Sequence, residues 1–162
     1  MKKIIVLGSG GSGKSTFAQK LSQKLGLPLI VLDQHYWSPG WISPPKKDWR
    51  NKVSELVKKD QWIMDGNYKS TFDIRFPASD TIIWLNRNRF LCCWRVIKRR
   101  LLNDRVDKLD GCNEKVDLQF FKWVLWDYPT KGRKMTREFL RKYQNKKVFI
   151  LKHQKDIKKF LA

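Results

Sequence analysis

The sequence predicts one α/β domain whose parallel β-sheet is covered by helices on both faces. Two observations carry this prediction. Short apolar runs alternate with amphipathic stretches along the chain, and a glycine-rich turn joins the first run to the first stretch. Such alternation is typical of β-α-β units, whose ligands bind beyond the carboxyl ends of the strands. The 162 residues suffice for one domain of this kind.

Five apolar runs are expected to form the strands: residues 4–7, 29–32, 62–64, 81–85 and 148–151. Helices are expected between them and after them, over residues 14–25, 46–60, 89–103, 117–126, 131–143 and 156–162. Gly26 and Pro28 should stop the first helix, and Ser43 should cap the second helix ahead of Pro44. Residues 34–45 form an aromatic and proline-rich loop, and residues 104–115 form a polar connection.

The turn at residues 8–15 reads Gly-Ser-Gly-Gly-Ser-Gly-Lys-Ser, which matches the phosphate-binding P-loop pattern G-x-x-x-x-G-K-S/T. The glycines let backbone N–H groups turn inward around phosphate oxygens, and the helix N-terminus adds partial positive charge. Lys14 is expected to reach the β- and γ-phosphates of ATP, and the Ser15 hydroxyl to ligate Mg²⁺. The predicted nucleotide-binding residues are Gly8, Ser9, Gly10, Gly11, Ser12, Gly13, Lys14, Ser15 and Thr16.

Two carboxylates follow apolar strands at the edge of the sheet where the P-loop also lies. Asp65 comes directly after the run Trp-Ile-Met, and Asp33 follows the second run. Because Lys14 and Ser15 alone do not complete a magnesium shell, Asp65 is expected to hold the metal, directly or through water. Asp33 could accept a proton from an attacking hydroxyl or hold the acceptor. The alternative for each is an aspartate that caps a helix or a turn.

The charge and the cysteines narrow the class of protein. The chain has 35 Lys plus Arg against 15 Asp plus Glu, a net charge of +20, which favours polyanionic partners or is simply a solvated basic surface. No long apolar run predicts a transmembrane helix, and a strand begins at once, so a cytoplasmic protein without a signal peptide is expected. Cys92, Cys93 and Cys112 lack the spacing of a zinc site and are interpreted as reduced structural thiols.

Three further stretches resemble a known family. The sequences WIMDGNY at 62–68, CWRVIKR at 93–99 and FKWVLWD at 121–127 resemble the bacterial proteins called DNA topology modulation protein, or FlaR, within the adenylate-kinase-like P-loop kinases. That resemblance implies a sheet order 2-3-1-4-5, a helical lid over about residues 100–118, and Mg-ATP as phosphate donor. It also implies that Arg95 and Arg99 clamp phosphates. The residues themselves agree, since positions i and i+4 share one helix face.

The acceptor is left open by the sequence. Adenylate kinases carry Asp-Gly-Phe-Pro-Arg after the third strand, whereas Asp65 and Gly66 are followed here by Asn-Tyr-Lys. Lys69 or Arg75 could replace that arginine as the contact to the acceptor. Tyr36, Trp37 and Trp41 could stack on a base or sugar, or could pack beneath the helix that follows them.

The function expected from the sequence is an ATP-dependent phosphotransferase acting on a small acceptor, such as a nucleoside or nucleotide. A nucleic-acid-binding regulator and a kinase of nucleic-acid ends are the alternatives. Weak, non-specific contact with nucleic acid is expected from charge alone, no membrane partner is expected, and the chain is expected to be a monomer or a homodimer.

Overall fold

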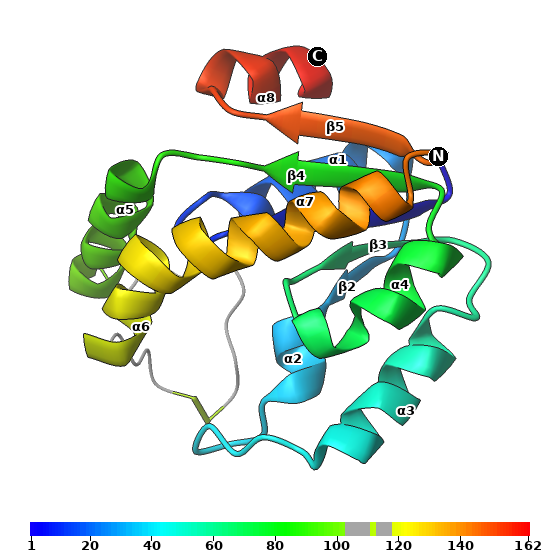
Figure 1. Cartoon of the computed structure of the whole chain (residues 1–162), viewed down its shortest axis with the longest axis horizontal. Coiled ribbons are helices and arrows are strands. Elements are labelled where there is room, and N and C mark those ends of the chain that lie inside the picture. Colours follow the sequence, from blue (N-terminus) through cyan, green and yellow to red (C-terminus); the bar gives the residue numbers. More distant parts are fainter. Residues whose placement is uncertain (103–110, 113–117) are drawn as a thin grey trace.

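A parallel five-stranded sheet in the order β2-β3-β1-β4-β5 runs through the centre of the molecule in the computed structural model, which describes residues 1–102, 111–112 and 118–162 (Figure 1). The strands are β1 Lys3–Gly8, β2 Leu29–Val31, β3 Trp62–Asp65, β4 Thr81–Leu85 and β5 Lys147–Leu151. All four neighbouring pairs are parallel. The strand order and the α/β class are those expected from the sequence.

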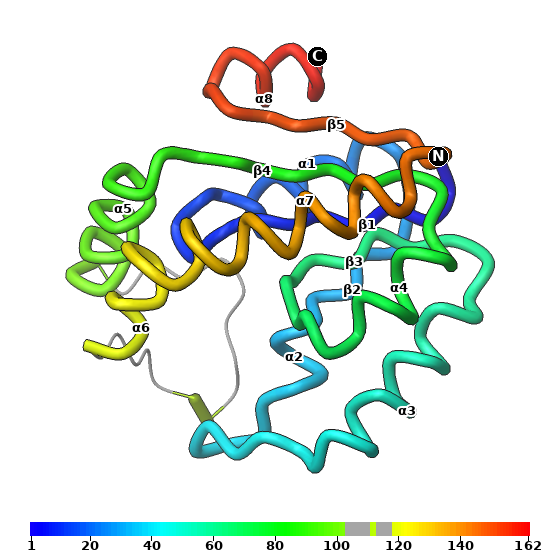
Figure 2. Tube along the Cα trace, in the orientation of Figure 1, coloured from blue at the N-terminus to red at the C-terminus, as the bar shows by residue number. Residues whose placement is uncertain are grey.

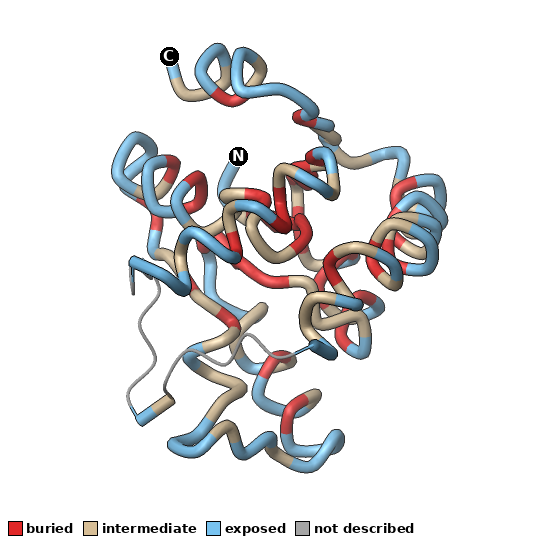
Figure 3. The backbone as a smooth tube through the Cα atoms, turned by 90° about the vertical axis from the view of Figure 1, so that its left-hand side faces the viewer, coloured by how far each residue is buried: buried red, intermediate tan, exposed pale blue. Residues whose placement is uncertain are grey.

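Two hydrophobic clusters hold the helices onto opposite faces of the sheet. On one face, Ile4, Val6 and Ile83 pack with residues of α1 (Lys14–Leu25) and α8 (Gln154–Leu161). On the other, Ile5 and Trp84 join residues of α3 (Lys46–Leu56), α4 (Phe72–Ala78) and α7 (Arg133–Lys142). Successive strand side chains point to opposite faces, so the central strands are apolar throughout. Figure 3 shows the buried residues gathered in the interior of the molecule, with the exposed residues on the outer sides of the helices.

The segments that follow β2 and β3 differ from the prediction. Helix α2 (Leu32–Tyr36) begins where the strand was expected to continue, so Asp33 lies in its first turn. A 3₁₀ turn, η1 (Lys69–Thr71), and helix α4 follow β3 and were not predicted. Pro77 inside α4 and the shortness of α4 hide its periodicity. Helix α3 begins after Pro45 without a side-chain cap, so the expected role of Ser43 was wrong.

The two helices expected over residues 117–126 and 131–143 form one continuous helical run. This run consists of α6 (Leu118–Lys122), the π-helix η2 (Trp123–Gly132) and α7, as Figure 2 shows. Pro129 lies within the π-helix, where it cannot donate a backbone hydrogen bond. The Trp84 indole N–H donates to the Tyr128 hydroxyl at 3.0 Å and ties this run to the sheet.

Helix α5 (Arg89–Leu102) follows β4 and lies beside α6 (Figure 1). The lid expected over about residues 100–118 lies largely outside the described residues. Among the helices that the structure does describe, none has the length and apolarity needed to cross a bilayer. Cys92 and Cys93 are buried free thiols on α5. Burial raises the pKa of the Cys92 thiol against the opposing charge of Arg95, which suits a structural, protonated cysteine.

Candidate phosphate-binding site

The P-loop joins β1 to α1 through two glycines in the left-handed region. Gly11 has φ 71° and Gly13 has φ 87°, and Gly13 is the residue before α1 begins. At Gly11 a Cβ atom would lie 2.1 Å from the Cys92 carbonyl oxygen, so only glycine lets α5 pack this closely against the loop. At Gly13 a Cβ atom would lie 3.5 Å from Nη1 of Arg95, which places that guanidinium beside the loop.

A cavity of about 630 Å³ opens over the P-loop, between α1, α5 and α8. Its basic lining includes Lys14, Arg95 and Arg99, and the Ser15 hydroxyl belongs to the same lining. The remaining residues of the lining are Gly11, Ser12, Gly13, Thr16, Phe17, Lys20, Lys98, Leu102, Gln154, Ile157, Lys158, Leu161 and Ala162. The P-loop residues Lys14 and Ser15 therefore share one cavity with Arg95 and Arg99, which lie far from them in the sequence. Their roles in binding phosphate and metal stay a proposal.

The chemistry of the loop fits an anionic ligand. The hydroxyls of Ser9 and Ser12 are buried and have no hydrogen-bond partner among the residues that the structure describes. Buried polar atoms are nearly always paired in native proteins, so these two are suited to an acceptor that comes from a ligand. Together with the N-terminus of α1 and the basic lining, they make a candidate site for phosphate. The apolar side of the cavity, around Ile157 and Leu161, suits a flat, weakly polar group such as a purine.

Asp65 ends β3, whereas Asp33 lies in α2 just after the neighbouring β2, and neither aspartate is part of the lining of this cavity. Asp65 is the last residue of β3, is 2% exposed, and stands level with Val6 of β1 and Val31 of β2. Asp33 is partly exposed and accepts a hydrogen bond of 2.7 Å at Oδ1 from the Tyr68 hydroxyl. Both carboxylates thus stand at the carboxyl edge of the sheet, where the P-loop begins.

The loop between β3 and η1 holds two candidate site residues that the sequence analysis did not single out, Asn67 and Tyr68. The side-chain amide of Asn67 pairs with both polar groups of the Gly8 backbone, at 3.2 and 2.6 Å. Tyr68 has φ 25°, which is unusual for a residue with a side chain. The one sequence signal was the replacement of Phe-Pro-Arg by Asn-Tyr-Lys after Asp65 and Gly66.

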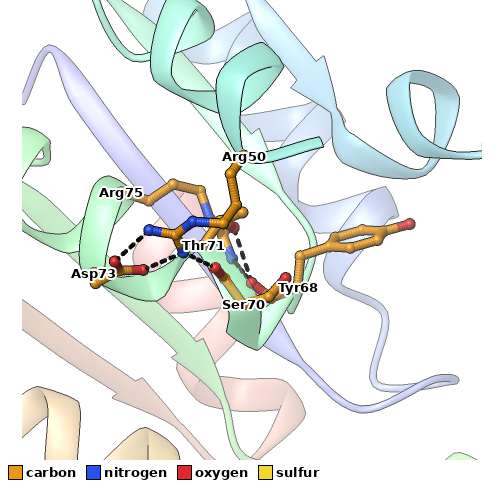
Figure 4. Close-up of polar contacts among 6 residues, drawn as sticks. All are labelled: Arg50, Tyr68, Ser70, Thr71, Asp73 and Arg75. Atoms are coloured by element: carbon orange, nitrogen blue, oxygen red, sulfur yellow. Dashed lines mark hydrogen bonds and ion pairs between the residues drawn. The ribbon is translucent and has the colours of Figure 1, made fainter. Parts of the chain in front are cut away.

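Arg75 is buried and donates its hydrogen bonds to the backbone of this loop, so its guanidinium is not exposed to an acceptor. It is fully buried and donates to the carbonyls of Gly66, Asn67 and Tyr68 and to the Thr71 hydroxyl. Figure 4 shows its guanidinium turned into the loop, while Arg50 pairs with Asp73 and Ser70 outside it. Burial lowers the pKa of Arg75 to about 9, although Tyr68 and Asp65 oppose the shift, so Arg75 stays charged at neutral pH. The suggestion that Arg75 contacts the acceptor was therefore wrong; Lys69 stays a candidate.

The aromatic residues near Asp33 are packed together. The rings of Tyr36, Trp49 and Tyr68 lie with centroids 4.7 to 4.9 Å apart, and Trp49 is a buried residue of α3. Of the two alternatives for Tyr36, packing beneath the following helix is the one observed. Trp37 and Trp41 contact each other edge to face, with centroids 5.4 Å apart.

Comparisons with known proteins agree with this architecture. Shikimate kinase from Acinetobacter baumannii, solved in complex with shikimate, superposes with a TM-score of 0.66 at 15% identity, over 99% of this chain and 89% of that one. A candidate kinase from Chloroflexus aurantiacus superposes with a TM-score of 0.55 at 16% identity, over 98% and 93% of the two chains. The chain has the P-loop kinase fold. At these identities the likeness extends to the fold alone.

Relatives in sequence add little to this P-loop kinase fold. The uncharacterized Bacillus subtilis protein YqaC is 32% identical over 82 residues, which are 45% of this chain and 46% of that protein. The match thus spans about half the length of the relative. No family model matches the chain, and the resemblance to the FlaR proteins is not confirmed.

Proposed function

We propose that this protein is an ATP-dependent phosphotransferase that moves the γ-phosphate of Mg-ATP to a hydroxyl group of a small acceptor. The observation that supports this most directly is the single cavity that Lys14, Ser15, Arg95 and Arg99 line. A P-loop alone is compatible with many nucleotide-binding functions. Two arginines one helical turn apart over the same loop are what phosphoryl transfer needs, because charge develops on the transferred group.

Each residue of the cavity has a distinct role in this proposal. Lys14 binds the β- and γ-phosphate oxygens, while the backbone N–H groups of residues 8–16 surround the phosphates. The guanidinium groups of Arg95 and Arg99 neutralise the charge that moves to the leaving oxygen. Ser15 and Asp65 would hold magnesium, which neutralises phosphate charge when bound.

Asp33 serves the acceptor in this proposal. The acceptor oxygen forms a bond to the γ-phosphorus, the bond from that phosphorus to ADP breaks, and the hydroxyl proton passes to the Asp33 carboxylate. Its place in α2, beside the strand end that carries Asp65, supports this assignment.

The acceptor class that we favour is a nucleoside or nucleotide. We propose that the enzyme is cytoplasmic and related to the FlaR proteins. Because shikimate kinase shares the fold at a TM-score of 0.66, hydroxylated carboxylic acids should be tested as acceptors as well.

One further observation favours contact with nucleic acid. A second cavity of about 500 Å³ is lined by Arg137, Arg141 and Lys146 over apolar Val148 and Ile150. Because α7 and β5 supply it away from the P-loop, we assign it no role in transfer.

The proposal is tested first by thermal unfolding with and without Mg-ATP. At ligand a hundredfold above its dissociation constant, about 2.7 kcal/mol of stabilisation is expected. Lys14→Ala should lose most of this gain, and Lys59→Ala, which removes an exposed lysine in the bend after α3, should retain it. ADP formation is then measured with nucleosides, nucleotides, hydroxy acids and oligonucleotides. A wild-type protein that Mg-ATP does not stabilise would overturn the proposal.

A further inference from the structure

The hydrogen bond between Tyr68 and Asp33 joins two segments that the sequence separates. The Tyr68 hydroxyl, from the loop after β3, donates to Asp33 Oδ1 on α2 at 2.7 Å across 35 residues of sequence. The Tyr68 ring packs against both Tyr36 and Trp49, with centroids 4.7 and 4.9 Å away, and those two rings contact each other as well. Because a packed ring has few rotamers to choose from, the position of its hydroxyl is fixed.

The backbone of Tyr68 is held in an unfavourable conformation to reach this position. Its φ and ψ are 25° and 70°, and such strain, about 1–3 kcal/mol, persists only where the surroundings enforce it. Here Arg75 and the Thr71 side chain and backbone all donate to the Tyr68 carbonyl. Figure 4 shows the ring leaving the turn on the side away from Arg75. The turn is therefore anchored from below and presents the phenol outward.

The neighbouring residue anchors the same loop to the phosphate side. Asn67 binds the Gly8 backbone through both ends of its amide, and its own carbonyl accepts from Arg75 at 2.5 Å. Helix α2, by contrast, has five residues and no side-chain cap, so Asp33 gains little rigidity from its own helix. Adjacent residues of one strained loop thus bind the first glycine of the P-loop and the carboxylate of Asp33.

We infer that Tyr68 is a positioning residue for phosphoryl transfer, whose hydroxyl orients the Asp33 carboxylate toward the acceptor. Asn67 binds the Gly8 backbone and so fixes how far this carboxylate lies from the P-loop. This inference rests on the proposed function. The unfavourable backbone conformation of Tyr68 then serves catalysis, because it holds the hydroxyl that orients Asp33. A general base that is out of position loses much of the rate gained by binding the acceptor beside it.

The experiment is a double-mutant cycle with Tyr68→Phe, which removes the hydroxyl and keeps the ring, and Asp33→Ala, which removes the acceptor oxygen. We expect Tyr68→Phe to lower kcat about tenfold or more, with KM for Mg-ATP unchanged, since the nucleotide cavity is lined by other residues. In the Asp33→Ala background, Tyr68→Phe should have no further effect on kcat. Tyr143→Phe, at another partly buried aromatic cluster, is the matched control and should leave kcat unchanged.

The wild type, the two single variants and the double variant of this cycle are also unfolded in urea, which tests the contact between Tyr68 and Asp33 without any turnover. Non-additive shifts of the unfolding midpoint show that the hydroxyl and the carboxylate interact in solution. Additive midpoints, or kcat losses that multiply in the double variant, would overturn the positioning role. A wild type that binds Mg-ATP but phosphorylates no acceptor would refute the proposed function instead, and the urea cycle would still report whether Tyr68 holds Asp33.

Discussion

The side chain of Asn67 continues the pairing of β1 with β3 beyond the end of the strand. The ladder between these strands reaches Val6 and Asp65, and the Gly66 N–H still donates to the Val6 carbonyl at 3.3 Å. Asn67 Oδ1 then accepts from the Gly8 N–H, and Nδ2 donates to the Gly8 carbonyl. A carboxamide carries the same donor and acceptor as a peptide group, so the side chain takes the place of the next strand residue at the start of the P-loop.

Asn67→Asp is expected to weaken Mg-ATP binding about tenfold or more, which is about 1.4 kcal/mol. The carboxylate cannot donate to the Gly8 carbonyl, and it adds negative charge where the phosphate loop begins. Isothermal titration with Mg-ATP measures the change. Asn51→Asp, which makes the same replacement at an exposed position of α3, is the control. Affinity within about twofold of the wild type would show that the P-loop holds its form without Asn67.

Arg75→Lys is expected to destabilise the fold by about 2–4 kcal/mol, although it keeps the charge. The guanidinium makes four hydrogen bonds in a buried site, and an ammonium group cannot reproduce that planar fork, so buried carbonyls lose their donors. Urea unfolding measures the loss. Arg50→Lys, at the exposed pair with Asp73, should shift the midpoint far less. Equal effects of the two variants would argue against a structural role specific to Arg75.

What the sequence could and could not predict follows from where each signal lies. The bounds of α1 and β4 were predicted as observed, because apolar spacing and the flanking glycine are local signals. The cavity could be anticipated in part, since Arg95 and Arg99 stand at i and i+4. The Gly66–Tyr68 loop could not, because Arg75 binds its backbone carbonyls, and carbonyls are the same for every residue type. Likewise, a backbone dihedral such as that of Tyr68 has no signature outside glycine.

Stability is expected to fall in acid partly through Asp80. Its carboxylate accepts from the Lys2 and Lys3 backbone N–H groups and from the Thr81 hydroxyl, at 2.6 to 3.0 Å. Burial alone would raise the pKa of Asp80, but these hydrogen bonds outweigh it and lower the pKa below its ordinary value. A lowered folded-state pKa contributes stability above the unfolded-state pKa, and this is lost as pH falls through the folded-state value.

Asp80→Asn should therefore destabilise the protein at neutral pH and have a diminishing effect as the pH falls below the unfolded-state pKa of aspartate, about 3.9. Urea midpoints of wild type and variant across this range test the sign. Asp60→Asn, at an exposed turn, is the control and should show a smaller pH-dependent difference. A destabilisation that stays constant with pH would mean that the hydrogen bonds matter but the charge does not.

Arg95→Ala and Arg99→Ala should each reduce turnover by about 10²-fold or more while changing Mg-ATP affinity much less. Groups that meet charge as it develops contribute mainly to the transition state. Steady-state kinetics beside titration calorimetry separates the two effects. Arg100→Ala, on the same helix but not part of the cavity lining, serves as the control. Loss of affinity with kcat preserved would assign both arginines to ground-state binding of the nucleotide.

Binding of duplex DNA should be weak, non-specific and independent of the P-loop. The net charge of +20 gives counterion release with a slope of about 0.9 per phosphate neutralised, and dissociation constants of about 10⁻⁴ to 10⁻⁶ M at physiological salt. Arg137 and Arg141 line the second cavity, so replacing both by alanine should weaken DNA binding and reduce the salt slope. Replacing Lys46 and Lys47, two exposed lysines that begin α3, removes equal charge and should matter less.

Lys14→Ala should leave DNA binding unchanged, because α7 and β5 supply the second cavity, whereas the P-loop lies between β1 and α1. The deciding measurement is DNA affinity with and without Mg-ATP at about 0.15 M salt. Equal affinities fit a phosphotransferase whose basic surface is incidental. A change of more than about tenfold, or about 1.4 kcal/mol of coupling, would instead make the ATP site a switch for nucleic-acid binding. Since coupling is reciprocal, DNA would then have to change the affinity for Mg-ATP by the same factor.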